Sequence, residues 1–115
     1  MDQSIKQHNE NFAICGQLSP EDLAEVARLG FRSVICNRPD HEGGAEQPTS
    51  ETLAREAGAL GLRFAYLPVV ANAITPDHVR QMKALLDELP APVLAFCRTG
   101  NRSAILYDLT RQPGV

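Results

Sequence analysis

The chain has few of the residues that would build a disulfide framework, a metal centre or a membrane anchor. Its three cysteines are an odd number without paired spacing, which argues against disulfides and fits a reducing compartment. His8, His41 and His78 are scattered singly, so we expect no metal site and no cofactor. No run approaches transmembrane length, and residues 1–11 lack the apolar core of a signal peptide. We therefore expect a cytoplasmic protein without a membrane partner.

Charge of one sign is not concentrated anywhere along the chain. The formal net charge is -3, and no block of lysine and arginine occurs, so we expect no nucleic-acid partner. The 115 residues are enough for one hydrophobic core but not for two. We predict a polar N-terminal segment over residues 1–11 and a single catalytic domain over residues 12–115.

Short apolar runs alternate with helical patterns from residue 12 onward. Runs at 12–15, 33–36, 63–67 and 93–96 have the length and composition of strands. Capping signals open helices at Ser19, at Thr49 or Ser50, and at Thr75. This alternation predicts an α/β fold with a mainly parallel central sheet and helices on both faces. Ligands of such sheets bind at the C-terminal ends of the strands.

The stretch over residues 93–103, VLAFCRTGNRS, carries the strongest chemical signal. An apolar strand leads into Cys97, and a helical pattern begins at Ser103. The N–H groups of such a loop and the positive end of the helix dipole converge on one point and bind an anion there. The same field lowers the pKa of a thiol, so Cys97 is the candidate nucleophile. Cys15 and Cys36 have the pattern of buried strand cysteines.

The residues around Cys97 supply the rest of the predicted site. Arg102 offers a planar fork suited to an oxyanion, and Arg98 adds a second positive charge for an anionic substrate. Ser103 supports the thiolate or caps the helix. We expect the loop N–H groups to bind the substrate, and they come from the remaining residues of the loop, Thr99, Gly100 and Asn101.

Two further loops lie at strand ends that face the same edge of the predicted sheet. Residues 38–48 are polar and rich in helix-breaking residues, and residues 68–73 follow the third strand. Arg38 is a candidate third contact to the substrate anion, or simply a loop charge. Asp40 is a candidate substrate contact, or an ordinary turn aspartate after a proline.

The motif Cys-Arg-Thr-Gly-Asn-Arg-Ser resembles the active loops of cysteine-based phosphatases and of rhodanese sulfurtransferases. From residue 12 onward, the chain is similar to the phosphatase-like domain of the beta-lactamase hydrolase-like protein family. The motifs that carry this likeness are Cys15-Gly16-Gln17, residues 37–42, Tyr66-Leu67-Pro68-Val69 and the Cys97 loop. The resemblance implies a protein-tyrosine-phosphatase-like fold. It also implies a link to sulfur chemistry and a persulfide dioxygenase-like partner domain, because the phosphatase-like domain of this family often lies beside a domain of that kind.

Three features depart from the phosphatase pattern. Four residues separate Cys97 from Arg102, as in rhodanese-type loops, whereas phosphatases of this type have five; one residue of backbone spans ~3.5 Å. Phe96 stands where phosphatases usually carry histidine. Residues 68–74 contain no Asp, Glu or His to protonate a leaving group, which leaves Asp40 and Asp77 as candidate acids. Loss of such an acid slows the reaction by roughly 10²- to 10⁴-fold.

Three functions follow as alternatives. The departures favour a sulfurtransferase in which Cys97 takes sulfane sulfur from thiosulfate or a persulfide and passes it to an acceptor. The alternative is a tyrosine- or dual-specificity-like phosphatase that hydrolyses a phosphate ester through a Cys97 phosphoenzyme. The third is a non-catalytic module that carries sulfur or binds an anion for a partner. In each case the ligand is a small anion.

Overall fold

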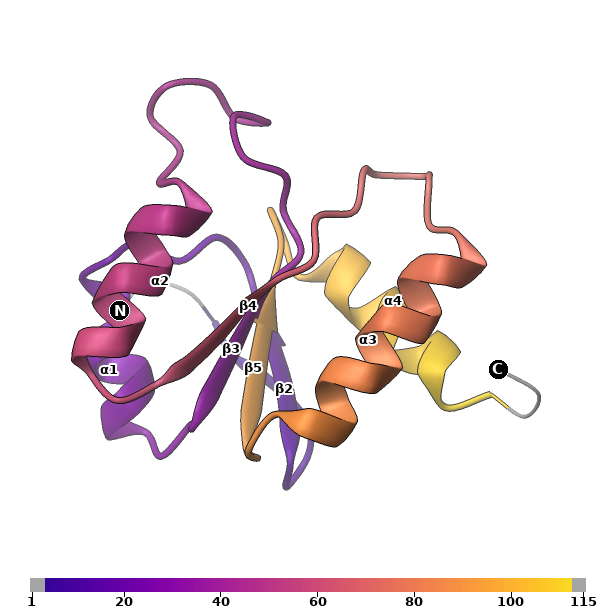
Figure 1. Ribbon diagram of the computed structural model, residues 1–115, viewed down its shortest axis with the longest axis horizontal. Helices are drawn as coiled ribbons and strands as arrows, with labels where there is room; N and C mark the ends of the chain where they lie inside the picture. The colour runs from indigo at the N-terminus through magenta and orange to yellow at the C-terminus, as the bar shows by residue number, and fades with distance from the viewer. Residues whose placement is uncertain (1–3, 113–115) are drawn as a thin grey trace.

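The computed structural model describes residues 4–112 and has a five-stranded sheet at its centre (Figure 1). The strands are β1 (Lys6–Asn9), β2 (Phe12–Cys15), β3 (Ser33–Cys36), β4 (Arg63–Tyr66) and β5 (Val93–Phe96), in the order β1-β2-β5-β3-β4. Strands β2, β5, β3 and β4 are parallel, and β1 pairs antiparallel with β2. The predicted α/β class with a mainly parallel sheet is confirmed.

Two helices cover each face of the sheet (Figure 1). The first pair is α1 (Asp22–Arg28) and α2 (Ser50–Ala59), and the second is α3 (Pro76–Glu88) and α4 (Asn101–Thr110). The predicted caps of α2 and α3 are confirmed, because the Thr49 and Thr75 side chains accept hydrogen bonds from first-turn N–H groups. Helix α4 begins two residues earlier than the apolar pattern indicates.

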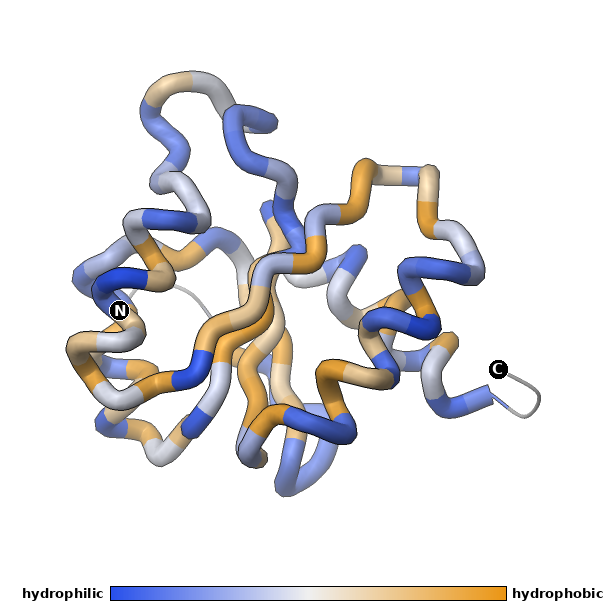
Figure 2. Tube along the Cα trace, viewed as in Figure 1, coloured by the Kyte–Doolittle hydropathy of each residue, from blue (hydrophilic) through white to orange (hydrophobic). Residues whose placement is uncertain are grey.

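The two faces of the sheet build two separate hydrophobic cores. On β5, Leu94 and Phe96 pack on the side of α1 and α2, and Val93 and Ala95 pack on the side of α3 and α4. Every residue of β2, β3 and β5 is buried, which explains why these strands are apolar apart from Ser33, whose Oγ donates to the carbonyl oxygen of Pro90. Figure 2 shows these strands as apolar segments through the middle of the molecule.

Strand β1 lies in the segment that composition predicts to be a polar N-terminal extension. Its backbone pairs with β2 while most of its side chains stay exposed, so the strand leaves no apolar pattern in the sequence. It forms one edge of the sheet, and β4 forms the other. Residues 1–3 and 113–115, the ends of the two predicted segments, lie outside the described residues.

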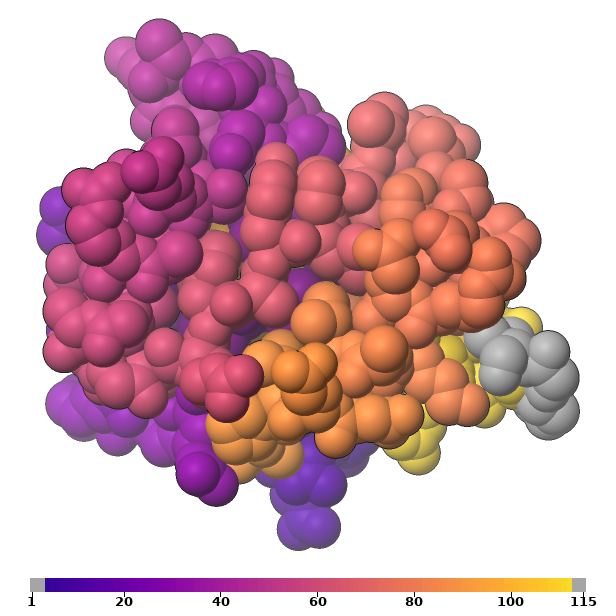
Figure 3. All heavy atoms as spheres, viewed as in Figure 1, coloured from indigo at the N-terminus to yellow at the C-terminus, as the bar shows by residue number. Residues whose placement is uncertain are grey.

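The C-terminal ends of the parallel strands meet at one edge, and three connections gather there. They are the loop after β5, the connection at 38–48 and the connection at 68–75. In Figure 3 the 38–48 and 68–75 connections form two projections, and the surface is hollowed between them. This hollow lies at the edge where the parallel topology predicts ligand binding.

Candidate active site

Cys97 lies at the end of β5, directly before the turn into α4. Its Sγ accepts a hydrogen bond from the backbone N–H of Gly100 at 3.1 Å. Gly100 has φ of 95°, and a Cβ there would lie 3.2 Å from the carbonyl oxygen of Cys15. Only glycine fits this left-handed turn without strain, and the turn directs the loop N–H groups toward the sulfur.

The three cysteines differ in the direction in which the protein shifts the pKa of their thiols. Burial raises the pKa of Cys97, but backbone N–H groups of the loop and of the first turn of α4 more than offset this effect and lower its pKa below the ordinary value. Burial, the largest cause, raises the pKa of both Cys15 and Cys36 to about 12. All three cysteines are buried, and Cys97 is the one whose thiol pKa is lowered, so Cys97 stays the candidate nucleophile.

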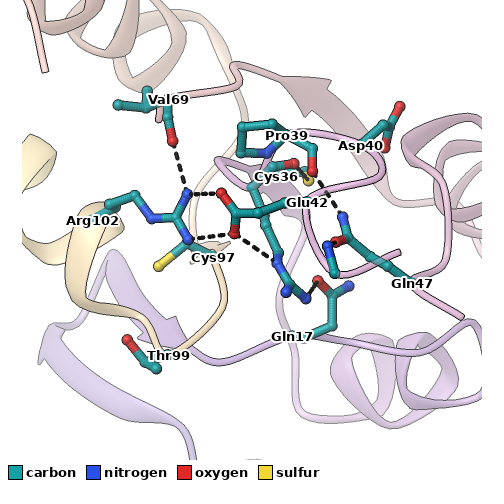
Figure 4. Close-up of polar contacts among 12 residues, drawn as sticks. Gln17, Cys36, Pro39, Asp40, Glu42, Gln47, Val69, Cys97, Thr99 and Arg102 are labelled. Atoms are coloured by element: carbon teal, nitrogen blue, oxygen red, sulfur yellow. Dashed lines mark hydrogen bonds and ion pairs between the residues drawn. The ribbon is translucent and has the colours of Figure 1, made fainter. Parts of the chain in front are cut away.

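The fork of Arg102 is bound to a carboxylate of the same chain. Its Nη1 donates to Oε2 of Glu42 at 2.7 Å and its Nη2 donates to Oε1 at 2.8 Å (Figure 4). Nη1 also donates to the carbonyl oxygen of Val69 at 2.9 Å. The sequence predicts that this fork binds the substrate oxyanion. The structure instead directs both terminal nitrogens to Glu42 and keeps the side chain only 9% exposed.

Glu42 also holds Arg38, so one carboxylate bridges two arginines. Nε of Arg38 donates to Oε1 of Glu42 at 2.9 Å, and its Nη1 donates to Oε1 of Gln17 at 3.1 Å. The hydrogen bond from Arg102, and then that from Arg38, hold the pKa of Glu42 at about 2 against the opposing effect of burial. Glu42 is a site residue that the sequence analysis does not single out, because no local spacing relates it to Arg102, 60 residues away.

Ser103, in the first turn of α4, links the end of the Cys97 loop to the ends of β3 and β4. Its Oγ donates to Oδ1 of Asn37 at 2.8 Å, and Nδ2 of Asn37 donates to the carbonyl oxygen of Leu67 at 3.0 Å. Ser103 and Asn37 are fully buried. The backbone N–H of Ser103 also contributes to lowering the pKa of Cys97. Asn37 is the second residue that the sequence analysis does not single out, since its partners are distant in the chain.

Asp40 is not brought to the sulfur. Its carboxylate accepts hydrogen bonds from the backbone N–H and from the Oγ of Ser50, both at 2.8 Å. Its own backbone N–H donates to the Tyr66 hydroxyl at 2.8 Å. In Figure 4 its side chain points away from Cys97. The structure therefore places Asp40 as a contact at the start of α2 rather than beside the candidate nucleophile.

The remaining predicted residues lie on the exposed side of the loop. Oγ1 of Thr99 accepts a hydrogen bond from the Asn101 N–H at 3.3 Å, and both residues are exposed. Arg98 is exposed as well, and its backbone carbonyl accepts a hydrogen bond from the N–H of Gln17 at 3.3 Å. These three side chains therefore line the approach to the site rather than the sulfur itself.

Two other classes of site are not built by residues 4–112. In that range no group of three or more histidine, cysteine or acidic side chains is placed to hold a metal ion. None of its helices has the length and apolar character needed to cross a membrane.

Comparison with known proteins places these features in a family. Residues 4–113 match the model of the phosphatase-like domain of beta-lactamase hydrolase-like protein. The protein of that name from Xylella fastidiosa is 32% identical over 102 residues, and the one from Agrobacterium fabrum is 35% identical over 101 residues. These matches cover 89% and 88% of this chain but only 23% of each relative. The chain thus spans about a quarter of the length of the curated relatives it matches.

Solved structures with phosphatase-like folds are also similar to this chain. A candidate phosphatase from Neisseria meningitidis is 34% identical, with a TM-score of 0.85, and the match covers 93% of this chain and 75% of that one. A Cys-to-Ser variant of TpbA from P. aeruginosa, solved in complex with phosphotyrosine, is 20% identical with a TM-score of 0.65 over 93% of this chain and 61% of that one. The second likeness shows the fold alone. With the resemblance of the Cys97 loop and the family match in agreement, the chain belongs to the family of phosphatase-like domains of beta-lactamase hydrolase-like proteins.

Proposed function

We propose that this chain is a cysteine-dependent phosphatase that hydrolyses aryl phosphate monoesters through a phosphorylated Cys97. The observation that carries the proposal is a low-pKa thiol facing the N–H groups of a strand-to-helix loop, with Arg102 beside it. The similarity to a candidate phosphatase at 34% identity supports phosphoryl chemistry more than sulfur transfer.

The chemistry takes two displacement steps at phosphorus. The Cys97 thiolate attacks the phosphoryl group, the S–P bond forms, and the aryloxide leaves with the electrons of the P–O bond. Water then attacks the phosphocysteine, the S–P bond breaks, and phosphate and the thiolate are released. The loop N–H groups stabilise the charge on the equatorial oxygens in both steps.

The aryl preference follows from the carboxylates around the site. Glu42 has a pKa of about 2, so it is ionised at neutral pH and has no proton to donate. Asp40 is bound by Ser50, and Asp77 is an exposed residue of α3 bound by Arg80 and Gln81. A leaving group that departs without a proton must be a weak base, as a phenolate is and an alkoxide is not.

Sulfur transfer is the second candidate, and two observations favour it. The loop is one residue shorter than those of phosphatases, and expulsion of sulfite from thiosulfate needs no general acid. Here the Cys97 thiolate attacks the outer sulfur of thiosulfate, a persulfide forms, and sulfite leaves with the electrons of the S–S bond. A thiolate or cyanide acceptor then removes the outer sulfur and regenerates the Cys97 thiolate.

One experiment separates these functions. The wild-type protein and a Cys97→Ser variant are each incubated with p-nitrophenyl phosphate or with thiosulfate, and the released product and the intact mass are measured. Phosphate release that depends on Cys97 supports the proposal. A mass gain of one sulfur atom on Cys97 without phosphate release refutes it and establishes sulfur transfer when an acceptor thiol removes that sulfur.

The same experiment addresses the non-catalytic alternative. A protein that gains one sulfur atom on Cys97 but passes it to no small acceptor acts as a carrier. In that case the acceptor would be another part of a longer protein, and a persulfide dioxygenase-like domain is the partner we propose. Adding such a domain as a separate protein and following loss of the sulfur from Cys97 tests this assignment.

A further inference from the structure

Three arginines lie around the Cys97 loop, and within residues 4–112 they differ in whether an acidic side chain binds them. Arg38 and Arg102 both donate to Glu42. The Arg98 side chain is exposed and makes no hydrogen bond or ion pair with any residue in the range 4–112. Arg98 is thus a cation beside the site whose charge no carboxylate of the described chain compensates.

Arg98 stands between two cavities that flank the catalytic loop. The first, which we call the Glu42-side cavity, has a volume of about 510 Å³ and is lined by Arg38, Glu42 and Gly43. The second, the α4-side cavity, has a volume of about 380 Å³ and includes Ile74 and Ile105 among its lining residues. Both cavities share Arg98, Arg102 and Ala71 in their walls.

The two cavities differ in whether an acidic residue lines them. The Glu42-side cavity includes the Glu42 carboxylate, which is held between Arg38 and Arg102 and occupies their hydrogen-bond donors. The α4-side cavity has no acidic residue in its wall. Its polar residues are Asn72, Thr99 and Asn101, which can form hydrogen bonds with a bound anion.

The α4-side cavity also has an apolar wall. Ile105 is 40% exposed although it lies in a helix next to the catalytic loop, and Ile74 is partly buried beside it. An aryl ring fits against such aliphatic side chains, and a negative group on the ring would face Arg98. The α4-side cavity therefore offers an aromatic anion both an apolar surface and a positive charge.

We propose that Arg98 and the α4-side cavity form a second anion subsite, which binds an anionic substituent on the leaving group of an aryl phosphate. This inference rests on the proposed phosphatase function, because that function makes the aryl group the leaving group. The substrate class is then an aryl phosphate with a second negative charge, rather than a simple phenyl phosphate. Arg98 acts as a specificity-determining residue and is distinct from Arg102, whose terminal nitrogens are bound to Glu42.

The test compares two esters that differ only in charge. Para-carboxyphenyl phosphate carries the second anion, and para-carbamoylphenyl phosphate is its neutral analogue of the same size. For each protein we take the ratio of kcat/KM for the two esters, which cancels general effects on the reaction. We expect Arg98→Gln to lower this ratio by about fivefold, the effect of one exposed charged hydrogen bond.

Arg55→Gln is the matched control, since it removes the same charge from an exposed position on α2. We expect the control to keep the wild-type ratio, because only a long-range field effect would change it. A ratio that Arg98→Gln leaves at the wild-type value overturns the subsite. An equal fall in both kcat/KM values gives that same unchanged ratio and shows that Arg98 acts on the reacting phosphoryl group.

A measurement of ligand binding tests the second anion subsite independently of the proposed phosphatase function. Calorimetry with Cys97→Ser and with the double variant Cys97→Ser/Arg98→Gln measures the Kd of both esters without turnover. A preference for the carboxylate ester that disappears with Arg98 supports the subsite even if wild type hydrolyses neither ester, in which case only the phosphatase function fails. Equal Kd values for both esters in Cys97→Ser refute the subsite, whatever the turnover.

Discussion

Replacing Glu42 by glutamine removes a negative charge from a position where it meets two nearly buried guanidinium groups. The side chains of Arg38 and Arg102 are 11% and 9% exposed, and Glu42 is 26% exposed. Glutamine keeps one acceptor oxygen but directs an amide N–H at a guanidinium N–H. Charged hydrogen bonds contribute roughly 1.5–3 kcal/mol each, and solvent screening at Glu42 lowers that figure. We expect the free energy of unfolding at neutral pH to fall by about 2–3 kcal/mol.

The same substitution releases Arg102 from its position beside Cys97. We expect kcat/KM for an aryl phosphate to fall roughly 10- to 100-fold, which corresponds to about 1.4–2.8 kcal/mol of transition-state stabilisation. The assays are urea unfolding followed by circular dichroism and steady-state hydrolysis. Glu51→Gln is the control, because its ion pair with Arg55 is 3.4 Å long and its side chain is 86% exposed. This control should change stability by less than about 0.5 kcal/mol.

The pH dependence provides an independent test of the same contact. The pKa of Glu42 is about 2 in the folded chain and about 4.3 in an unfolded one. A depressed folded pKa stabilises the protein above the unfolded pKa, and this contribution is lost as the pH falls toward 2. The stability difference between wild type and Glu42→Gln should therefore be full at pH 7 and shrink between about pH 4 and pH 2.

Two results would refute the reasoning about Glu42. If Glu42→Gln lowers the free energy of unfolding by less than about 0.5 kcal/mol and changes kcat/KM by less than about twofold, the carboxylate does not hold Arg102. If kcat/KM rises, Glu42 competes with the substrate for the arginine instead of positioning it. A double-mutant cycle with Arg38→Gln would then measure how much of the effect passes through the second arginine.

Three further predictions concern the nucleophile, its loop and its substrate. At neutral pH iodoacetamide should label Cys97 alone, because burial raises the pKa of Cys15 and of Cys36 to about 12; mass mapping that finds label on either of these would contradict the assignment. Gly100→Ala should destabilise the protein by about 1–2 kcal/mol in urea unfolding and slow the labelling of Cys97, since the loop must leave its left-handed turn; unchanged labelling would count against the N–H cradle. Across a series of aryl phosphates, kcat/KM should fall steeply as the pKa of the phenol rises, and a flat dependence would reveal a general acid.

Much of the fold could be predicted from the sequence, because local patterns carry it. The buried strands β2, β3 and β5 are apolar apart from Ser33, and Thr49 and Thr75 mark where two helices begin. Strand β1 could not be predicted, since its side chains are polar and mostly exposed, and its contacts with β2 and Tyr107 join residues that no local pattern relates. A strand is recognised in the sequence by its buried apolar side chains, so a strand whose side chains are mostly exposed is missed.

The residues of the candidate site likewise fall into those that the sequence predicts and those that only the fold brings together. Cys97 and its loop are contiguous in the chain, so residue order alone indicates a thiol in a field of N–H donors at a helix start. The partner of Arg102 could not be predicted, because Glu42 comes from a connection that only the folded sheet brings to the loop. Asp40, two residues before it, turns the other way to Ser50, and nothing in the local sequence distinguishes the two carboxylates.

By itself, then, the sequence determined the class of fold, and it predicts Cys97 as the nucleophile and a small anion as the ligand. These depend on hydrophobic period, caps and a continuous motif, which are local. The tertiary structure alone decided that Arg38 and Arg102 are bound to Glu42 while the Arg98 side chain is exposed. That decision depends on ion pairs between residues far apart in the chain, whose geometry is set only when parallel strands align their C-terminal ends.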